Sequence, residues 1–257
     1  MDSYTTPIDD VDHLRRSYKL FALNHVRLPA DIGSTDLDRV DSLIHDKRLL
    51  ERGKTLFRQG DASDSLYVVR SGSLKTIVGD PAGGTQVLGF HLPGDIVGVG
   101  GLGRDHYLGS AEALERSYVW SIPHPQLLQI LSQIPDLNRQ LLEIAGKWVN
   151  TNLEHLVIMG KLHARERLAM FLRSFASRYE RLSRDPTNLL LPMSRRDLAN
   201  YLGLAMETVS RQFGCMETEG ILVVDCKKVH ILRPDLLADM CGDDQPMTHN
   251  SHSNAAS

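Results

Sequence analysis

The sequence contains few cysteines and none among its first 214 residues. The three that are present, Cys215, Cys226 and Cys241, lie far apart and form no C-x-x-C pair. Disulfide scaffolds and structural zinc sites need paired or clustered cysteines. We therefore expect reduced thiols in a cytoplasmic protein, without a disulfide framework or a cysteine-based metal site.

Long apolar runs are also missing. No stretch reaches the roughly 18 apolar residues that a membrane-spanning helix needs. The first residues, MDSYTTPIDDVD, lack the basic and then apolar segments of a secretory signal. We expect neither a membrane span nor a secretory signal.

The sequence carries none of the short motifs that mark common enzyme classes. It has no P-loop, no G-x-S-x-G and no H-E-x-x-H, and no G-x-G-x-x-G in the strand-to-helix setting of a phosphate-binding loop. The glycine-rich stretch at residues 89–103 (GFHLPGDIVGVGGLG) alternates with short apolar runs, which is typical of turns between strands. We expect a protein that is not an enzyme.

The charge is unevenly distributed along the chain. The whole chain has a formal charge of −3, but residues 160–234 hold 13 Lys and Arg against 8 Asp and Glu, a net of +5. A basic segment in an acidic chain indicates a local contact with a polyanion such as nucleic acid. A solvated basic surface is the alternative explanation.

The texture of the sequence predicts several regions. Residues 1–34 form an N-terminal arm, and apolar residues at helical spacing begin at Ser34. Between about Leu49 and Ile122, short apolar runs alternate with Gly, Asp and Pro, which predicts a β-barrel or jelly roll. We assign this sensor domain to residues 35–134. The polar tail, 241–257, is expected to be disordered.

A long helix is predicted to follow Pro135 and to occupy residues 135–162. Apolar residues recur there in alternating steps of four and three, which is the pattern of a coiled-coil seam. We predict that this seam forms a homodimer, although one thick core face in a monomer would have the same spacing. The predicted seam residues are Leu141, Ile144, Trp148, His155 and Ile158. A second apolar stripe, Leu142, Ala145, Val149, Leu156 and Met159, lies beside the first.

The most informative segment is Ser194–Phe213, SRRDLANYLGLAMETVSRQF. Ser194 and Asp197 have the spacing of a capping box, and Gly203 supplies the tight turn between two helices. Apolar Ala199 and Val209 are placed to pack between those helices. The strand-like runs at 221–225 and 228–232 follow as a hairpin, and residues 189–192 supply a third strand. We predict a winged helix-turn-helix within residues 163–240.

The second of these helices presents a polar face. Glu207, Ser210 and Arg211 stand at i, i+3 and i+4 and therefore share one side. Arginine can bind guanine and glutamate can accept from cytosine in the major groove, so we predict that these residues contact bases. An exposed Glu–Arg pair on an ordinary surface helix is the alternative. The predicted phosphate contacts are Arg195, Arg196, Thr208, Lys227 and Lys228.

These segments resemble the CRP/FNR family of bacterial transcription regulators over about residues 35–240. The resemblance rests on GKTLFRQGD (53–61), SLYVVRSGSLK (65–75), LGFHLPGDIVG (88–98), RERLAMFL (165–172) and residues 194–222. It implies an α+β fold: a cyclic-nucleotide-binding-like jelly roll, a dimerisation helix and a C-terminal winged helix-turn-helix. The E-x-x-S-R pattern resembles that of the FNR-like subgroup and implies a palindrome such as TTGAT-N4-ATCAA. The function implied is that of an activator that can also repress.

The chain departs from the family at its ligand positions. FNR-type oxygen sensors bind an iron–sulfur cluster through four cysteines, three of them in the N-terminal arm, where this chain has none. Cyclic-AMP binders carry an Arg-Ser pair that grips the phosphate, and the equivalent pair here is Gly109–Ser110. We therefore expect neither an iron–sulfur cluster nor bound cyclic AMP. At the start of the second helix, Ala205 stands where a capping Ser or Thr is usual, and Gln212 replaces an apolar residue.

The input signal stays open between three options. Haem could bind through His13, His25, His91, His106 or His124, although a lone histidine is more often an ordinary surface or core residue. A cyclic dinucleotide is the second option, and control by protein abundance without any ligand is the third. Residues 79–85 match a region that contacts RNA polymerase in relatives, or they form a plain hairpin turn. A regulatory barrel that acts on a protein partner is the alternative function, but it leaves the winged helix unexplained.

Overall fold

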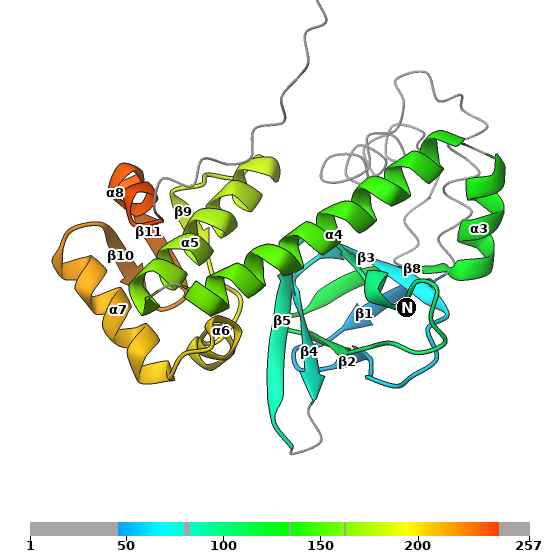
Figure 1. Cartoon of the computed structure of the whole chain (residues 1–257), viewed down its shortest axis with the longest axis horizontal. Helices are drawn as coiled ribbons and strands as arrows, with labels where there is room; N and C mark the ends of the chain where they lie inside the picture. Colours follow the sequence, from blue (N-terminus) through cyan, green and yellow to red (C-terminus); the bar gives the residue numbers. More distant parts are fainter. Residues whose placement is uncertain (1–45, 80–82, 134, 162, 242–257) are drawn as a thin grey trace, which may run out of the picture.

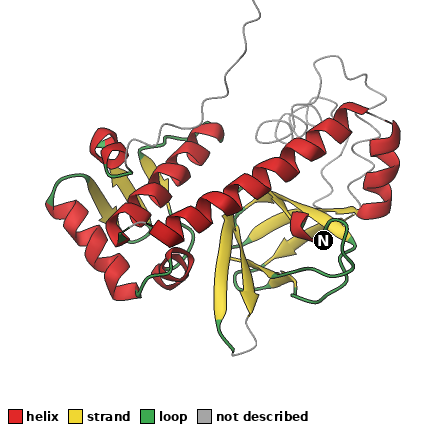
Figure 2. Cartoon of the chain, viewed as in Figure 1, coloured by secondary structure: helices red, strands yellow, loops and turns green. Residues whose placement is uncertain are grey.

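The computed structural model describes residues 46–79, 83–133, 135–161 and 163–241. The predicted arm, the predicted helix that begins at Ser34 and the tail from residue 242 onward lie outside these ranges. The described chain forms a β-sandwich and a smaller C-terminal domain, which one long helix joins (Figures 1 and 2). This is the α+β architecture that the sequence predicted.

The sandwich consists of two antiparallel four-stranded sheets. One sheet has the order β1 (Asp46–Leu50), β8 (Ser117–Pro123), β3 (Ser65–Ser71) and β6 (Ile96–Val97). The other has the order β2 (Thr55–Phe57), β7 (Ser110–Ala113), β4 (Leu74–Gly79) and β5 (Thr85–His91). The short helix η1 (Val99–Gly101) follows β6. Glycine turns separate the strands, as the alternation of apolar runs with glycine predicted.

The core of the sandwich is apolar and aromatic. Phe57 stacks on Tyr107 with ring centroids 3.9 Å apart and on Tyr67 at 5.6 Å. The hydroxyl of Tyr107 donates a hydrogen bond to the carbonyl oxygen of Ser65 at 2.6 Å, so its polar end is satisfied inside the core. Side chains from both sheets therefore fill the interior.

Two helices lead away from the sandwich. Helix α3 spans His124–Gln133, and α4 spans Pro135–Lys161. Figure 1 shows α4 crossing the molecule from α3, beside the sandwich, to the C-terminal domain. Ile144 of α4 packs with Leu66, Val68 and Ile122 of the sandwich, which anchors the first half of the helix.

The C-terminal domain combines four helices with a three-stranded sheet. The helices are α5 (Ala164–Arg181), α6 (Arg195–Leu202), α7 (Met206–Thr218) and α8 (Pro234–Asp239). The sheet has the order β10 (Leu222–Asp225), β11 (Lys228–Ile231) and β9 (Asn188–Leu190). Its core is continuous with Val87, Phe90 and Leu92 of the sandwich, so the two domains share one apolar cluster.

Candidate nucleic-acid interface

Helix α6 begins with the predicted capping box. Ser194 Oγ accepts a hydrogen bond from the backbone N–H of Asp197 at 3.1 Å, and Asp197 Oδ2 accepts one from the backbone N–H of Ser194 at 3.1 Å. These bonds satisfy two N–H groups that a helix start otherwise leaves without partners. The helix ends at Gly203, whose φ of 62° is left-handed and suits a residue without a Cβ.

Helix α7 packs on α6 through one apolar side. Val209, Phe213 and Met216 are buried, and Leu202 of α6 is fully buried against them in the same cluster. Ala205 precedes α7 and makes no side-chain capping bond. The half-buried Gln212 stands beside buried Phe213, so the aromatic ring supplies apolar contact at this point of the helix. Together α6 and α7 form the tight helical pair that the sequence predicted.

The polar face of α7 lies open to solvent. Glu207, Ser210 and Arg211 are all exposed, while Thr208 is half-buried at the edge of this face. The structure thus places the three predicted base-contacting residues together on one accessible helix face.

The two arginines at the start of α6 differ in their surroundings. The guanidinium of Arg195 lies 3.7 Å from the ring centroid of Phe213, which is a cation–π geometry. Burial lowers the pKa of Arg195 from its usual value. Arg196, in contrast, is exposed. Arg195 therefore supports α7 directly, whereas Arg196 is free to meet a ligand from solvent.

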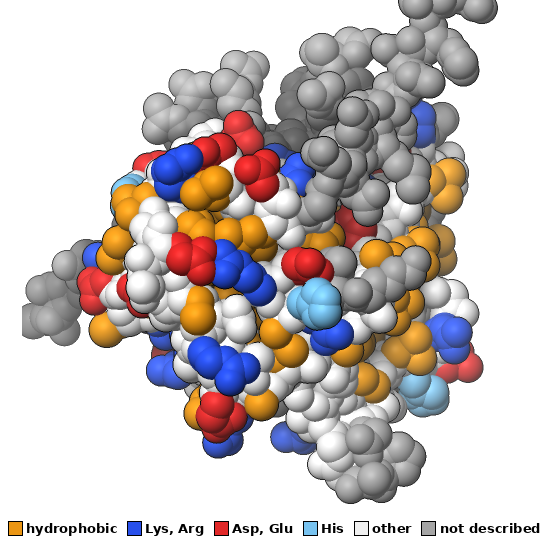
Figure 3. All heavy atoms as spheres, turned by 60° about the vertical axis from the view of Figure 1, so that its left-hand side comes forward, with side chains coloured by type: hydrophobic (Ala, Val, Ile, Leu, Met, Phe, Trp, Pro, Cys, Tyr) orange, Lys and Arg blue, Asp and Glu red, His pale blue; other side chains and the backbone are white. Residues whose placement is uncertain are grey.

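The hairpin of β10 and β11 extends beside α7. Asp225 pairs with Lys228, which leaves Cys226 and Lys227 as the turn, and Cys226 has a left-handed φ of 53°. Lys227 Nζ donates a hydrogen bond to the carbonyl of Pro192 at 2.8 Å, while Lys228 is exposed. On the face in Figure 3, basic, acidic and apolar side chains are interspersed rather than gathered by charge. A polyanion would therefore meet individual basic groups on this face and not a uniform basic patch.

The two apolar sides of α4 differ in their surroundings, and the predicted seam residues lie on the side nearer the sandwich. Ile144, His155 and Ile158 are buried within the chain itself. Leu141 packs on the same sandwich cluster as Ile144, and an added Cβ on Gly100 would lie 3.1 Å from Trp148 Cζ2. Three of the five predicted seam residues are thus buried within one chain, whereas Trp148 stays 40% exposed. Their part in a seam between two copies stays a prediction.

On the other side of α4, a second set of residues recurs in alternating steps of four and three and stays exposed. It consists of Leu142, Gly146, Val149, Leu153, Leu156 and Gly160. Leu142 and Leu156 are 69% and 66% exposed, which is unusual for leucines in a regular apolar repeat. An added Cβ on Gly146 or Gly160 would meet nothing within 4 Å. This face is the unpartnered heptad surface of the helix.

His155 instead connects α4 to the helical pair. Its ring stacks on Tyr201 of α6 with centroids 4.0 Å apart and planes within 3°. Its Nε2 lies 2.6 Å from the carbonyl oxygen of Tyr201 and must donate, because a carbonyl can only accept. Burial lowers the pKa of His155, and the bond to Tyr201 opposes that shift. The sequence carried no sign of this contact, because 46 residues separate the two rings.

At Gly109 the sandwich has no room for the arginine of the phosphate-gripping Arg-Ser pair. An added Cβ on Gly109 would lie 2.7 Å from the carbonyl oxygen of Ile77, so a larger side chain cannot enter without moving backbone. Within the described ranges no Lys or Arg is fully buried, and the mostly buried Lys75 of β4 is already paired with Asp197 and Glu112. A phosphodiester held in the interior needs a cationic partner, and Lys75 already serves two carboxylates.

The candidate haem ligands are scattered. His13 and His25 lie outside the described residues, His106 is exposed and His124 is half-buried. Nε2 of His91 lies 3.1 Å from Thr76 Oγ1, and its ring sits beside Asp95 and Arg178. Among the residues that the structure covers, no three His, Cys, Asp or Glu side chains cluster as a metal site would require. Nor is any helix within those residues both long and apolar enough to cross a bilayer.

The burial of His91 predicts a pH-dependent stability. Burial lowers the pKa of His91 from 6.5 to about 4, against a smaller opposing effect of Asp95. Because the unfolded chain binds the proton more readily, stability is lost as the pH falls from about 6.5 to about 4. We expect protonation of His91 to lower the free energy of unfolding at pH 5 by about 2 kcal/mol relative to neutral pH. Urea unfolding of wild type and His91→Asn at pH 7.5 and pH 5 checks this.

Other carboxylates and histidines also titrate in this range, so the comparison is between the two proteins. His91→Asn should flatten the loss of stability by about the same 2 kcal/mol. Equal pH dependence in both proteins would show that the His91 ring titrates normally.

Two family models match the chain. Residues 47–134 match the cyclic nucleotide-binding domain, and residues 166–240 match the Crp-like helix-turn-helix domain. The first match covers the sandwich except Asp46, together with all of α3, and the second covers the helical pair with the three-stranded sheet.

Curated relatives span nearly the same length. The chain is 38% identical over 215 residues to the transcriptional activator protein Anr of Pseudomonas protegens, covering 84% of this chain and 88% of the relative. It is 34% identical over 221 residues to the fumarate and nitrate reduction regulatory protein of Escherichia coli K12, covering 86% and 88%. Among solved structures, FixK2 from Bradyrhizobium japonicum superposes with a TM-score of 0.71 at 25% identity, covering 76% of this chain and 96% of that one.

Proposed function

The chain belongs to the CRP/FNR family of DNA-binding transcription regulators, and on that premise we propose that it binds a palindromic DNA site as a cytoplasmic homodimer. The site implied by the recognition helix is TTGAT-N4-ATCAA or a close variant. The protein acts as a regulator and not as an enzyme. The observation that carries this proposal is the exposed face of α7, where Glu207, Ser210 and Arg211 stand together above a well-packed helical pair.

Each residue of this face has a distinct part in the proposal. Arg211 donates two parallel hydrogen bonds to O6 and N7 of guanine, and Glu207 accepts from N4 of cytosine. Ser210 contacts a neighbouring base edge. Their exposure and shared side of the helix support this, since a major groove admits one helix face at a time.

Phosphate contacts set the position of the helix on the duplex. Arg196 and Lys228, both exposed, bind backbone phosphates, and half-buried Thr208 adds a hydroxyl donor. Arg195 and Lys227 already have partners in Phe213 and Pro192. We propose that they contact phosphate while holding α7 and the hairpin in place.

The homodimer forms through the exposed frame of α4. Leu142, Val149 and Leu156 repeat every seven residues, and this spacing lets two helices pack side by side over several turns. Gly146 and Gly160 leave room for close approach. A dimer of this kind presents two copies of α7, which a palindrome requires.

Activation then needs no cyclic nucleotide in the sandwich. The closed space at Gly109 and the pairing of Lys75 with two carboxylates support DNA binding by the protein as it is made, with control through its abundance. Haem and cyclic dinucleotides remain the ligands to add in the binding assay. At a promoter, we propose that the bound dimer contacts RNA polymerase, and that the position of the site decides between activation and repression.

The decisive test is the loss of base recognition in Arg211→Ala. Removing the guanidinium should cost about 1–3 kcal/mol on the TTGAT-N4-ATCAA duplex and relax specificity at one base pair. Fluorescence anisotropy on this duplex and on a scrambled one, at two salt concentrations, measures both effects. Wild type should bind the specific duplex more tightly, with affinity falling as salt rises.

Arg116→Ala is the matched control, because Arg116 is an exposed arginine on the sandwich. It should leave both affinities unchanged. Equal weakening of Arg211→Ala on specific and scrambled DNA would assign Arg211 to phosphate contact instead. Unselective binding by wild type, with or without added ligands, would contradict the proposed function.

A further inference from the structure

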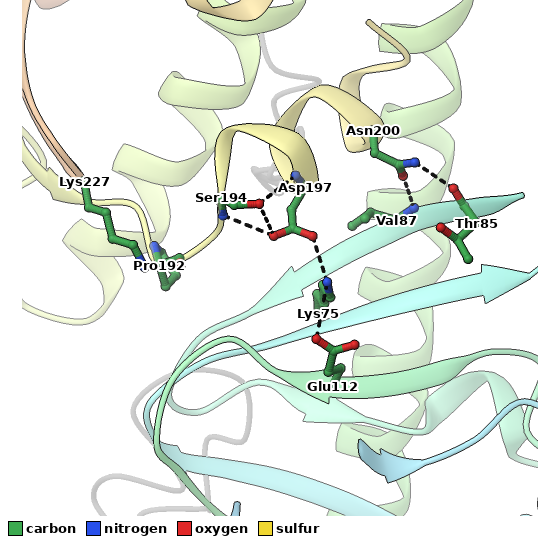
Figure 4. A network of polar contacts seen from close by, with 9 residues as sticks. All are labelled: Lys75, Thr85, Val87, Glu112, Pro192, Ser194, Asp197, Asn200 and Lys227. Atoms are coloured by element: carbon green, nitrogen blue, oxygen red, sulfur yellow. Dashed lines mark hydrogen bonds and ion pairs between the residues drawn. The ribbon is translucent and has the colours of Figure 1, made fainter. Parts of the chain in front are cut away.

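Helix α6 is held against the sandwich by an ion pair between distant parts of the chain. Lys75 Nζ of β4 lies 2.7 Å from Asp197 Oδ1 in the first turn of α6 and 3.5 Å from Glu112 Oε1 of β7. The Lys75 and Asp197 side chains are only 14% and 18% exposed. Figure 4 shows Lys75 between the two carboxylates. Partial burial shields this pair from solvent and salt more than an exposed pair.

Asn200, one turn further along α6, bonds to the edge of the same sheet. Its Oδ1 accepts from the backbone N–H of Val87 at 2.5 Å, and its Nδ2 donates to the carbonyl of Thr85 at 2.6 Å (Figure 4). Gln86 Nε2 in turn donates to the backbone carbonyl of Asn200 at 2.6 Å. β5 is the outer strand of its sheet, so the amide of Asn200 occupies backbone groups that a neighbouring strand would otherwise take.

These contacts fix more than α6. Leu202 and Val209 are both fully buried in the helical pair, so α7 must follow wherever α6 is held. Asp197 and Asn200 stand at i and i+3 on one side of α6, and Glu207 and Arg211 of α7 remain exposed. The docked arrangement therefore leaves the recognition face open while it sets where that face points.

We propose that β4 and β5 act as a spacing gauge for DNA recognition, a proposal that rests on the function proposed above. Lys75, Gln86, Asp197 and Asn200 are positioning residues that hold each α7 at a set distance and angle from the dimer axis. One base pair added between half-sites moves the second half-site by about 3.4 Å and turns it by about 35°. A docked dimer cannot follow that change, whereas a dimer with undocked helical pairs can.

The test compares palindromes whose half-sites are separated by three, four, five or six base pairs. Anisotropy with each duplex gives the ratio of affinities between the preferred spacing and the others. We expect wild type to prefer one spacing by at least about tenfold. In Lys75→Glu combined with Asn200→Ala, the preference should fall to about threefold or less, mainly through weaker binding at the preferred spacing.

Three controls separate this effect from general damage. Lys54→Glu makes the same charge change at an exposed position of the sandwich and should leave the preference intact. Lys75→Arg keeps the ion pair and should retain most of the preference. Binding to a duplex with a single half-site reports the helical pair alone, and should be equal in wild type and the double variant.

The outcomes distinguish a failure of the spacing gauge from a failure of the proposed DNA-binding function. If wild type selects no duplex at all, the proposed function fails. If wild type prefers the palindromes but binds all four spacings alike, or if the double variant keeps the wild-type preference, the spacing gauge is overturned. Tighter binding of the double variant to the preferred duplex would also overturn it, because the docked arrangement would then be inhibitory.

Discussion

Replacing Leu156 with aspartate is expected to convert the dimer to monomers and to weaken palindrome binding by at least about a hundredfold. Leu156 is 66% exposed and lies in the second heptad frame of α4. A charge placed there would be buried against the partner helix in a dimer, without a compensating group. Once the two copies separate, each half-site is bound alone and the gain from linked binding is lost. Sedimentation velocity and anisotropy measure the two effects on the same preparation.

Asn150→Asp is the matched control for this substitution. Asn150 is also exposed on α4, but it shares the polar side of the helix with Glu143 and Glu154. It should leave both the dimer and the affinity unchanged. An intact Leu156→Asp dimer would show that the exposed frame is not the contact between copies.

Replacing Leu202 with alanine should destabilise the C-terminal domain by about 2–5 kcal/mol. Leu202 is 0% exposed and lies in the apolar cluster that joins α6 to α7. The rigid neighbours cannot fill the space that the side chain leaves, so lost packing adds to the loss of apolar burial. Urea unfolding followed by circular dichroism measures the loss, and palindrome affinity should fall with it as α7 loses its support.

Leu232→Ala offers the comparison at an exposed leucine of the same domain. Leu232 is 45% exposed, and its truncation should change stability by less than about 0.5 kcal/mol. A loss below about 1 kcal/mol in Leu202→Ala would mean that the helical pair can repack without it.

Local signals in the sequence predicted the helical pair closely. Ser194, Asp197 and Gly203 act through bonds and angles within a few residues, and the structure confirms the capping box and the left-handed turn. The strands rich in Val, Ile and aromatic residues were predicted equally well. Two strands were not: β1 (DKRLL) begins with three charged residues, and β7 (SAEA) is short with small side chains. They are strands because β1 pairs with β8 and β7 pairs with β4, and not because their residues favour strands.

The long helix shows where periodicity stops being informative. Both of its apolar frames step by fours and threes, so the pattern reveals two faces without saying which neighbour each face meets. The spacing placed Ile144 and His155 in the predicted seam, and within one chain both are already buried. The choice depends on where the sandwich and Tyr201 lie in space, and residues far away in sequence set those positions.

The contact of α6 with the sandwich could not be predicted from the sequence for a related reason. Asp197 was predicted to cap the start of α6, and it does so. Its other carboxylate oxygen also binds Lys75, which lies 122 residues away in the sequence. A carboxylate that serves two partners gives the same local signal as one that serves a single partner. Asn200 likewise looks like an ordinary polar helix residue until β5 is placed beside it.

The close approach of Gly109 to β4 also limits how this protein can change over generations. A lineage that came to depend on cyclic nucleotides would have to install a cation in the sandwich that is not already paired, as Lys75 is. At Gly109 that route is closed to single substitutions, because any side chain meets the carbonyl of Ile77 at 2.7 Å. Moving that carbonyl would disturb the pairing of β4 with both β5 and β7. A descendant that responds to cyclic nucleotides must therefore either remodel the sheet first or recruit its cation from another strand.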